Sequence, residues 1–257
     1  MTRLLVVDSN PEAVNQTVRC HFGLSTGDAY ATVLAGLEPG LICTVVRPYD
    51  AERAPSFDAF DGMVFTGSGV EWNVEDARAK CLHDAMEQGF KAGIPVFGSC
   101  NGMQLAAVVL GGACHASANG REDGVAMNLQ LTAAGEQHPM MAGRCNGFSA
   151  LSVHRDEVAV LPKGAQLLAS NQHTAVQAFS YEQGQLRFWG TQYHPEFSPA
   201  SLASYLMSQR RLPPASVADL AIAEVNPPAA KRLGLAYRQL QFDVRTLELR
   251  NWLRQLA

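Results

Sequence analysis

The sequence predicts an α/β protein with a central, mainly parallel sheet covered by helices on both faces. In the first hundred residues, short apolar runs alternate with segments of helical periodicity, a pattern typical of parallel strands joined by crossover helices. After about residue 123 short apolar runs follow one another, separated by turns, so antiparallel strands are expected to extend the sheet. From about residue 198 the pattern is helical again.

The elements of the first half follow from hydrophobic periodicity. Four short apolar runs predict buried strands, over residues 4–7, 41–46, 62–65 and 96–98. Apolar residues spaced three or four apart predict helices over residues 26–37, 75–92 and 103–110. Pro39-Gly40 ends the first of these helices, and Gly93-Ile94-Pro95 ends the second.

The second half is expected to contribute further strands and then helices. The strands are predicted over residues 125–131, 148–153, 166–169, 176–181 and 186–192. Gln183-Gly184 indicates a hairpin between the last two strands. Ser198-Pro199 is expected to begin a helix that reaches about residue 211, and Pro213-Pro214 and Pro227-Pro228 to interrupt helical structure. Apolar residues at the C-terminus predict a short amphipathic helix.

The composition excludes several classes of protein. The 257 residues are 47% apolar and 17% charged, with a net charge of −4, which excludes a disordered chain, a collagen-like repeat and a disulfide miniprotein. No basic tract points to nucleic acid. No apolar run approaches the roughly 18 residues that span a bilayer, and none resembles a secretory signal. Six scattered cysteines lack metal-binding spacing, so we expect a reduced, cytoplasmic chain without metal or cofactor.

The most informative local motif is Gly98-Ser99-Cys100-Asn101-Gly102, which lies between a predicted strand and a predicted helix. This is the context of a nucleophile elbow, with cysteine at the reactive position. Glycines would relieve steric crowding around so tight a turn, and the following helix N-terminus would favour a thiolate. The alternative is a buried structural cysteine in an ordinary strand-to-helix turn.

A cysteine nucleophile needs a base and a group that orients the base. His194 and Glu196 follow a predicted strand, and positions i and i+2 of an extended chain point to the same side. Glu196 can therefore bond one ring nitrogen of His194 while the other nitrogen faces the thiol. Taken alone, His-Pro-Glu is more often a loop fragment.

An oxyanion hole is the third requirement. Thr66-Gly67-Ser68-Gly69 follows a strand that should end at the same sheet edge. The backbone N–H groups of Gly67 and Asn101 are the natural pair of donors. By itself this segment is more often an ordinary glycine-rich turn, and it lacks the full phosphate-binding fingerprints.

Together, these three motifs resemble the class I glutamine amidotransferases, whose active site is a Cys-His-Glu triad. Further similarity lies in Gly120-Arg121-Glu122 and in the segment from Val153 to Val158, and the resemblance covers roughly residues 1–200. It implies a flavodoxin-like three-layer sandwich. The chain departs from the best-known members at Gly67-Ser68-Gly69-Val70, where Gly-Gly-Pro is common, which puts the shape of the pocket in doubt.

The resemblance implies roles for individual residues. Cys100 would attack the γ-carboxamide carbon of a glutamyl group, His194 held by Glu196 would transfer the proton, and the N–H groups of Gly67 and Asn101 would bind the oxyanion. Gln104, Ser68 and Tyr193 are then candidates for binding the substrate. His154 either contacts substrate or a partner, or belongs to a solvated loop.

The resemblance leaves the leaving group and the partners open. We expect a catalytic domain over residues 1–200 and a helical extension over 201–257, which is too short for a synthetase and could shield the site or form a homodimer. The favoured hypothesis is a free-standing hydrolase of γ-glutamyl amides that serves amine degradation, including aromatic amines, after a glutamine-synthetase-like enzyme. The alternatives are a glutaminase subunit for a separate synthetase, a catalytically silent scaffold and a peptidase. The expected ligand is a small γ-glutamyl molecule, without nucleic acid or membrane.

Overall fold

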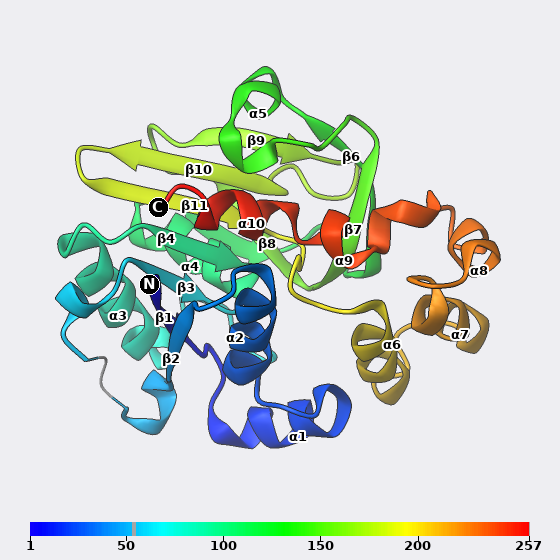
Figure 1. The fold of residues 1–257 in the computed structure, drawn as a ribbon, viewed down its shortest axis with the longest axis horizontal. Helices are drawn as coiled ribbons and strands as arrows, with labels where there is room; N and C mark the ends of the chain where they lie inside the picture. Colours follow the sequence, from blue (N-terminus) through cyan, green and yellow to red (C-terminus); the bar gives the residue numbers. More distant parts are fainter. Residues whose placement is uncertain (53–54, 257) are drawn as a thin grey trace.

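A nine-stranded mixed sheet forms the centre of the molecule, in the order β2-β1-β3-β4-β11-β10-β9-β6-β7 (Figure 1). The computed structural model describes residues 1–52 and 55–256. The strands of this sheet are β1 (Arg3–Val7), β2 (Ile42–Val46), β3 (Gly62–Phe65), β4 (Val96–Ser99), β6 (Glu122–Leu131), β7 (Phe148–His154), β9 (Gln166–Ser170), β10 (Ala178–Gln183) and β11 (Leu186–Thr191). Two further strands, β5 (Ala113–Ala116) and β8 (Asp156–Val160), pair separately.

The first five strands of this order are mutually parallel, and the remaining four are antiparallel. The predicted combination of parallel and antiparallel strands is therefore confirmed. Strands β3, β4 and β11 are neighbours, so their carboxyl ends meet at one edge of the sheet. The segments that carry Gly67, Cys100 and His194 leave the sheet at this edge.

Helices cover both faces of the sheet. The α-helices are α1 (Glu12–Phe22), α2 (Thr26–Leu37), α3 (Lys80–Lys91), α4 (Asn101–Val109), α5 (Ala133–Gln137), α6 (Pro199–Ser208), α7 (Pro214–Ile222), α8 (Pro227–Arg232), α9 (Phe242–Arg245) and α10 (Leu247–Leu253). Short 3₁₀ helices are η1 (Pro48–Asp50), η2 (Phe57–Ala59), η3 (Ala77–Ala79), η4 (Pro139–Met141) and η5 (Tyr237–Leu240). Within the described ranges, no helix has the length and apolar character needed to cross a membrane.

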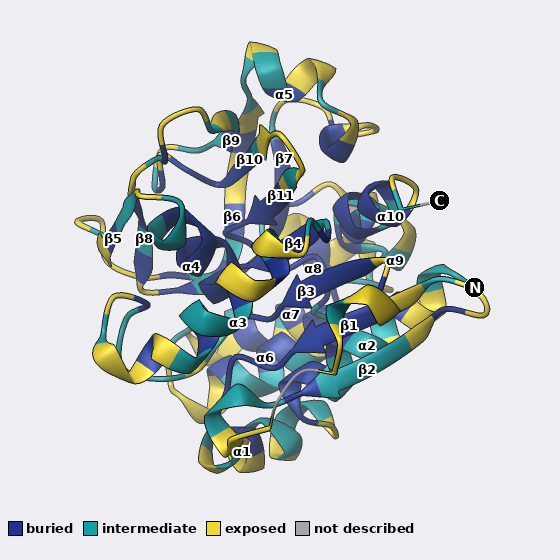
Figure 2. Ribbon diagram, turned by 90° about the vertical axis from the view of Figure 1, so that its left-hand side faces the viewer, coloured by how far each residue is buried: buried dark blue, intermediate teal, exposed yellow. Residues whose placement is uncertain are grey.

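The alternation of side chains along the buried strands creates two cores. In β1, Leu4 and Val6 pack with residues of α2 and α10, whereas Leu5 and Val7 pack with residues of α3 and α4. Figure 2 shows these strands as buried ribbons between helices whose outer faces are exposed. The arrangement is the three-layer sandwich that the sequence predicts.

The segment after residue 200 packs in two places. Helices α6, α7 and α8 share a third apolar cluster with Leu151 of β7. In contrast, Leu249 and Trp252 of α10 join the core on one face of the main sheet. A domain boundary at residue 200 stays a prediction.

Several predicted boundaries differ from the structure. The two proline pairs lie where helical structure is interrupted, between α6 and α7 and between α7 and α8, and one proline of each pair is the first residue of the next helix, where it loses no intrahelical hydrogen bond. The helix expected over 75–92 divides into η3 and α3. Helix α1 and the β5-β8 pair were not predicted.

Candidate active site

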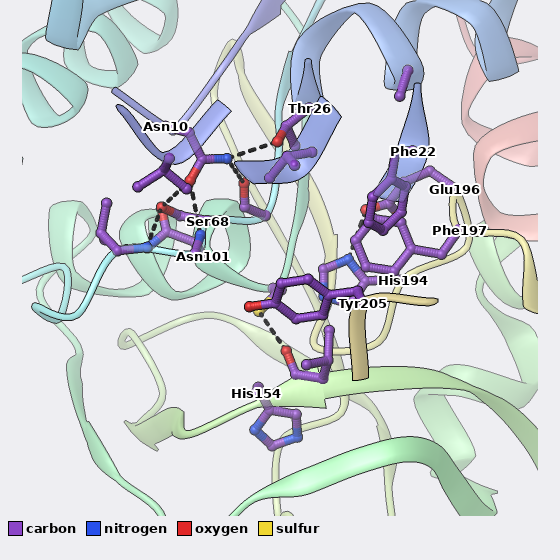
Figure 3. Close-up of a pocket in the computed structure, with 18 of the residues that line it drawn as sticks. Asn10, Phe22, Thr26, Ser68, Asn101, His154, His194, Glu196, Phe197 and Tyr205 are labelled. Carbon is purple, nitrogen blue, oxygen red and sulfur yellow. Dashed lines mark hydrogen bonds and ion pairs between the residues drawn. The ribbon is translucent and has the colours of Figure 1, made fainter. Parts of the chain in front are cut away.

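Gly67, Cys100, His194 and Glu196 line one cavity of about 580 Å³ at the carboxyl edge of the parallel strands. Figure 3 shows His194 and Glu196 on one side of this cavity and Asn10, Ser68 and Asn101 on the other. The sheet topology thus brings together three segments that are far apart in the sequence. This is the location at which open α/β sheets bind their ligands.

Cys100 lies on a strained turn between β4 and α4. Its φ of 50° and ψ of −105° are unusual for a residue with a side chain. A Cβ atom at Gly98 would lie 2.6 Å from the carbonyl carbon of Gly102, and one at Gly102 would lie 2.5 Å from the carbonyl oxygen of Phe65. Both glycines are therefore required by space, which supports the steric interpretation of the elbow.

His194 and Glu196 form a buried pair. Nδ1 of His194 lies 2.7 Å from Oε1 of Glu196. The other carboxylate oxygen of Glu196 accepts a hydrogen bond of 3.1 Å from Ser99, whose hydroxyl is 2.9 Å from that of Tyr30. Both oxygens of Glu196 are thus held, and the carboxylate fixes the orientation of the imidazole ring.

The imidazole of His194 is electrostatically prepared to carry a proton. Burial opposes its charge, but the carboxylate of Glu196 and the neighbouring Cys100 outweigh burial and raise the pKa of His194 to about 10. Its Nε2 atom is buried and has no hydrogen-bond partner among the described residues. The ring also stacks on Phe197, with 4.1 Å between ring centroids and an interplanar angle of 4°. The pair therefore presents one free nitrogen on a fixed, cationic ring.

The predicted oxyanion segment lies against this ring. A Cβ atom at Gly67 would be only 2.6 Å from Cε1 of His194, so only glycine leaves the imidazole its place. Asn101 is the first residue of α4, and its N–H therefore has no intrahelical acceptor. In addition, Oδ1 of Asn101 is buried and unpartnered within the described part of the chain. The site thus offers polar groups to a ligand beside the nucleophile.

Asn10 holds the oxyanion segment in place, a role that the sequence did not indicate. Its Oδ1 accepts hydrogen bonds from the N–H of Gly69, at 2.8 Å, and from the hydroxyl of Ser68, at 3.0 Å. Its Nδ2 donates to Thr26 at 2.8 Å. The side chain of Asn10 therefore connects the start of α2 to the segment after β3.

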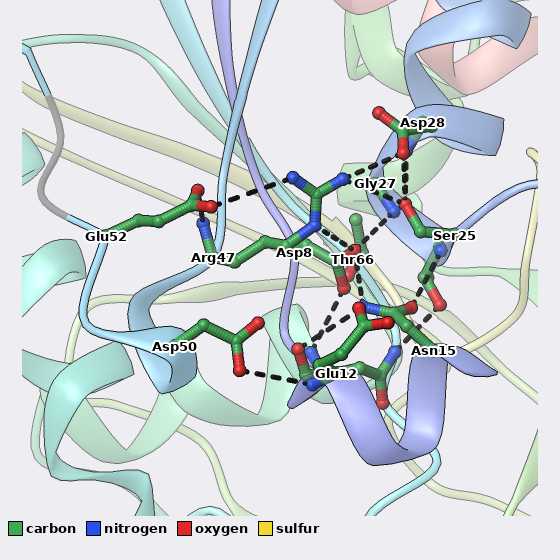
Figure 4. A network of polar contacts seen from close by, with 12 residues as sticks. Asp8, Glu12, Asn15, Ser25, Gly27, Asp28, Arg47, Asp50, Glu52 and Thr66 are labelled. Carbon is green, nitrogen blue, oxygen red and sulfur yellow. Dashed lines mark hydrogen bonds and ion pairs between the residues drawn. The ribbon is translucent and has the colours of Figure 1, made fainter.

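The buried carboxylate of Asp8, the residue after β1, fixes Asn10 in turn by accepting a hydrogen bond from its backbone N–H. Asp8 also accepts hydrogen bonds from the backbone N–H of Gly27 and from the side chain of Asn15 (Figure 4). Arg47 lies 3.9 Å from this carboxylate. Burial raises the pKa of Asp8 against the lowering effect of these partners. The network anchors the loop that supports Asn10.

Two glutamines, Gln104 of α4 and Gln192 after β11, are hydrogen-bonded to each other beside Cys100. Nε2 of Gln104 donates to the carbonyl of Asp156 at 2.7 Å and to Oε1 of Gln192 at 3.1 Å. Nε2 of Gln192 in turn lies 3.5 Å from the sulfur of Cys100. Gln104 lines the cavity as expected, but its amide nitrogen is already committed to the protein. Gln192, which the sequence did not single out, is the residue that reaches the thiol.

The remaining predicted substrate-binding residues are placed differently from one another. Ser68 lines the cavity, but its hydroxyl donates to the carbonyl of Ser9 at 2.7 Å. His154 also lines the cavity, although both of its ring nitrogens are engaged, by Glu122 and by the carbonyl of Asp156. His154 is buried rather than part of a solvated loop, and its contact with substrate stays a prediction.

The expectation that Tyr193 lines the pocket is corrected by the structure. Tyr193 is fully buried, and its hydroxyl donates to Oε1 of Glu248 at 2.7 Å. Alternation along the extended chain places it on the side opposite to its two neighbours, Gln192 and His194. Its side chain therefore faces α10 and the core.

One group of side chains has the proximity required of metal ligands. Potential ligand atoms of Glu122, His154 and His173 all lie within 4.8 Å of one another. The carboxylate of Glu122, however, already accepts hydrogen bonds from Asn171, at 2.7 Å, and Gln177, at 2.7 Å, and is 2.9 Å from Nε2 of His154. These bonds account for the lowered pKa of Glu122 despite its burial. In this structure the hydrogen-bonded carboxylate of Glu122 therefore holds the ring of His154 in place.

Known proteins share both the sequence and the fold of this chain. The family model for "Glutamine amidotransferase class-I" matches residues 30–210. A γ-glutamyl-L-1-hydroxyisopropylamide hydrolase from Pseudomonas sp. is 32% identical over 215 residues, which cover 81% of this chain and 72% of the relative. A glutamine-hydrolysing GMP synthase from Thiobacillus denitrificans is 33% identical over 204 residues, 72% of this chain but only 35% of the synthase.

Solved structures support the same assignment at the level of the fold. A glutamine amidotransferase from Thermotoga maritima superposes with a TM-score of 0.68 at 17% identity, covering 99% of this chain and 97% of that chain. A glutamine amidotransferase from Methylobacillus flagellatus gives a TM-score of 0.65 at 17% identity, covering 100% and 95% of the two chains. The match of the family model over most of the chain and the similarity to the Pseudomonas hydrolase together show that this chain belongs to the class I glutamine amidotransferases and is a cysteine-dependent amidase of that family.

Proposed function

We propose that this protein hydrolyses the amide bond of a γ-glutamyl amide through a thioester on Cys100, releasing glutamate and an amine. The observation that carries the proposal is the convergence of Cys100, His194 and Glu196 at the ends of two adjacent parallel strands, in one cavity. Nδ1 of His194 bonds Glu196, which orients the ring, and the free Nε2 is available to transfer a proton.

In the first half of the reaction, the thiolate sulfur of Cys100, whose proton has passed to His194, forms a bond to the γ-carbonyl carbon. The negative charge that develops on the carbonyl oxygen is received by the backbone N–H groups of Gly67 and Asn101. Because its pKa is raised to about 10, His194 holds a proton at neutral pH. It gives that proton to the nitrogen as the C–N bond breaks, and the neutral amine leaves.

In the second half, water replaces the amine. The now neutral imidazole of His194 takes a proton from this water, whose oxygen attacks the thioester carbon. The C–S bond breaks, glutamate is released, and the sulfur and His194 return to their starting state. Glu196 stays ionised throughout and stabilises the imidazolium form of the ring.

Recognition of the glutamyl group requires partners for its α-ammonium and α-carboxylate. The unpartnered Oδ1 of Asn101 is an acceptor suited to the ammonium, and Arg121, whose Nε also donates to Asp123 at 3.0 Å, lines the same cavity. We assign binding of the two charged groups to these side chains. Gln104, Ser68 and His154 then shape the pocket through their bonds to the protein.

We favour a free-standing hydrolase over an ammonia-delivering subunit. The Pseudomonas relative, named as a hydrolase of a γ-glutamyl amine, is matched over 72% of its length. The second candidate is a glutaminase subunit that serves a separate synthetase, and the similarity to the GMP synthases supports it. The leaving group distinguishes the two, because a subunit would release ammonia from glutamine.

The test is a panel of amides assayed for glutamate release by the purified chain. Turnover of γ-glutamyl alkylamides without added protein supports the hydrolase, whereas turnover of glutamine that requires a synthetase supports the subunit. Cys100→Ala should abolish release, while the matched control Cys145→Ala, at an exposed cysteine elsewhere, should not. Near-normal turnover by Cys100→Ala would refute the mechanism.

A further inference from the structure

The cavity continues beyond the triad into a region enclosed by α1, α6 and the segment that follows Glu196. Apolar side chains line this part, among them Val14 and Val18 of α1, Phe22 at its last turn, Phe197, and Tyr205 of α6. The whole cavity, at about 580 Å³, is within the roughly 300–1,000 Å³ of pockets that hold drug-sized ligands. This is more space than glutamine needs.

Three of these side chains form an aromatic cluster beside His194. The ring of Phe197 lies 4.1 Å from the imidazole and 5.0 Å from the ring of Phe22, measured between centroids. The rings of Phe22 and Tyr205 are 6.5 Å apart. All three aromatic residues are only half-buried, so part of each is available to a ligand. Figure 3 shows Phe22, Phe197 and Tyr205 on the His194 side of the cavity, away from Asn10, Ser68 and Asn101.

The chemistry of the cleavage orients the substrate relative to this cluster. The carbonyl oxygen must point toward the N–H groups of Gly67 and Asn101, and the leaving nitrogen must face Nε2 of His194, which protonates it. Whatever group the nitrogen carries therefore extends on the His194 side, where Phe22 and Tyr205 lie. The amine part of the substrate, rather than its glutamyl part, contacts the aromatic cluster.

The charges near the cluster restrict the amine further. Arg211 places its guanidinium 5.6 Å from the centre of the Tyr205 ring, and Arg245 also lines the cavity. Glu196, the nearby carboxylate of the triad, already has both oxygens bonded. The other cavity-lining residues with carboxylates, Glu71 and Asp156, belong to the segment after β3 and to the start of β8, not to the elements that carry the cluster. An amine with a second positive charge beside the cluster would therefore lie near Arg211 and Arg245.

Building on the proposed function, we infer that the amine released by this enzyme is apolar, carries no second charge and has an aromatic ring that packs against the accessible parts of Phe22, Phe197 and Tyr205. These three protein rings already contact one another, so the ligand ring adds to the cluster from the cavity side, at the centroid distances of about 4.5–7 Å that aromatic pairs prefer. Enclosure of the ring also removes apolar surface of the substrate from water.

The experiment compares kcat/KM for four substrates of the full chain: the γ-glutamyl amides of benzylamine, ethanolamine and putrescine, and glutamine. We expect the benzylamide to be preferred over each of the others by about tenfold or more, as expected for burial of several apolar atoms. Phe22→Ala and Tyr205→Ala should each reduce the benzylamide-to-glutamine ratio about tenfold. Met207→Ala is the matched control, because Met207 is 62% exposed on the same helix as Tyr205 and should leave the ratio unchanged.

The outcomes separate this inference from the proposed function. Equal or better turnover of the ethanolamine or putrescine amide would overturn the aromatic subsite and leave γ-glutamyl hydrolysis intact. No turnover of any of the four amides by the unmutated chain would overturn both. Since the preference of the unmutated chain is measured first, the inference can be refuted even if a variant fails to fold.

Discussion

Replacing Gly67 with alanine tests the packing of the oxyanion segment against the catalytic ring. A Cβ atom there would lie 2.6 Å from Cε1 of His194, about 0.8 Å closer than the 3.4 Å at which ordinary contacts begin. The imidazole cannot yield freely, because Glu196 holds it at 2.7 Å and Phe197 stacks on it. A misplacement of about 1 Å can lower a rate on the order of 10²-fold, equivalent to about 2.7 kcal/mol.

The assay is kcat for glutamate release, measured together with the midpoint of thermal unfolding. We expect Gly67→Ala to lose about 10²-fold in kcat while the protein remains folded, because the backbone at Gly67 is compatible with alanine. Gly36→Ala, inside helix α2, is the matched control: its Cβ would lie 3.7 Å from Phe242 of α9, an ordinary contact, and the change should stabilise the fold by about 0.4–1 kcal/mol. A kcat for Gly67→Ala within threefold of the unmutated value would refute the proposed packing.

Three further changes test the support of the site. Glu196→Gln should lower the pKa of His194 from about 10 and reduce kcat at least tenfold. A raised histidine pKa stabilises the folded state fully below pH 6.5, and this stabilisation is lost as the pH rises through about 10. Urea unfolding should therefore show a larger loss of stability for this variant near pH 6 than above pH 10. Glu248→Gln should cost about 3–5 kcal/mol in urea unfolding because it leaves the buried charge of Arg144 without its counterion. The double variant Arg144→Met/Glu248→Leu should recover part of this loss but not all of it, because the buried hydroxyl of Tyr193 then lacks its acceptor; a loss at least as large as that of Glu248→Gln would contradict this. Asn10→Ala should lower kcat about tenfold and also lower the melting temperature, because it removes buried hydrogen bonds to Gly69, Ser68 and Thr26; an unchanged kcat would show that the oxyanion segment does not depend on it.

The elements that sequence predicted well are those whose local pattern agrees with their burial. Helix α2 spans the predicted residues because Ser25 caps its start and Pro39-Gly40 follows its end. Helix α1 escaped prediction because its sequence is largely polar and Asn15 is its one residue that is fully buried. The helices that contact α1 are chiefly α2, which follows it directly, and α6, which lies far along the chain. Packing against other helices, rather than hydrophobic periodicity in its own sequence, therefore determines where α1 forms.

The same distinction applies to the active site. Cys100 and the His194–Glu196 pair were found because each acts through a short segment, a tight turn or an i, i+2 spacing. Asn10 and Gln192 were missed because their partners lie 59 and 92 residues away, and only the strand order brings them together. Tyr193 was misplaced although a signal existed: the i, i+2 rule applied to His194 already puts its neighbour on the opposite face.

Helices α9 and α10 contact the segment after β11 on both sides of the catalytic pair, His194 and Glu196. Before His194, the hydroxyl of Tyr193 donates to Glu248 of α10. After Glu196, Nε of Arg245 in α9 donates to the carbonyl of Phe197 at 2.7 Å. These bonds fix the chain immediately before and after the catalytic pair.

This geometry gives the C-terminal segment a role in positioning the catalytic pair. We expect Arg245→Met to lower kcat more than it raises KM, since it frees the carbonyl of Phe197 and with it the ring that stacks on His194. Arg245→Lys, which can still donate a hydrogen bond, should restore part of the loss. A loss of stability in Arg245→Met without any change in kcat would show instead that α9 serves the fold alone.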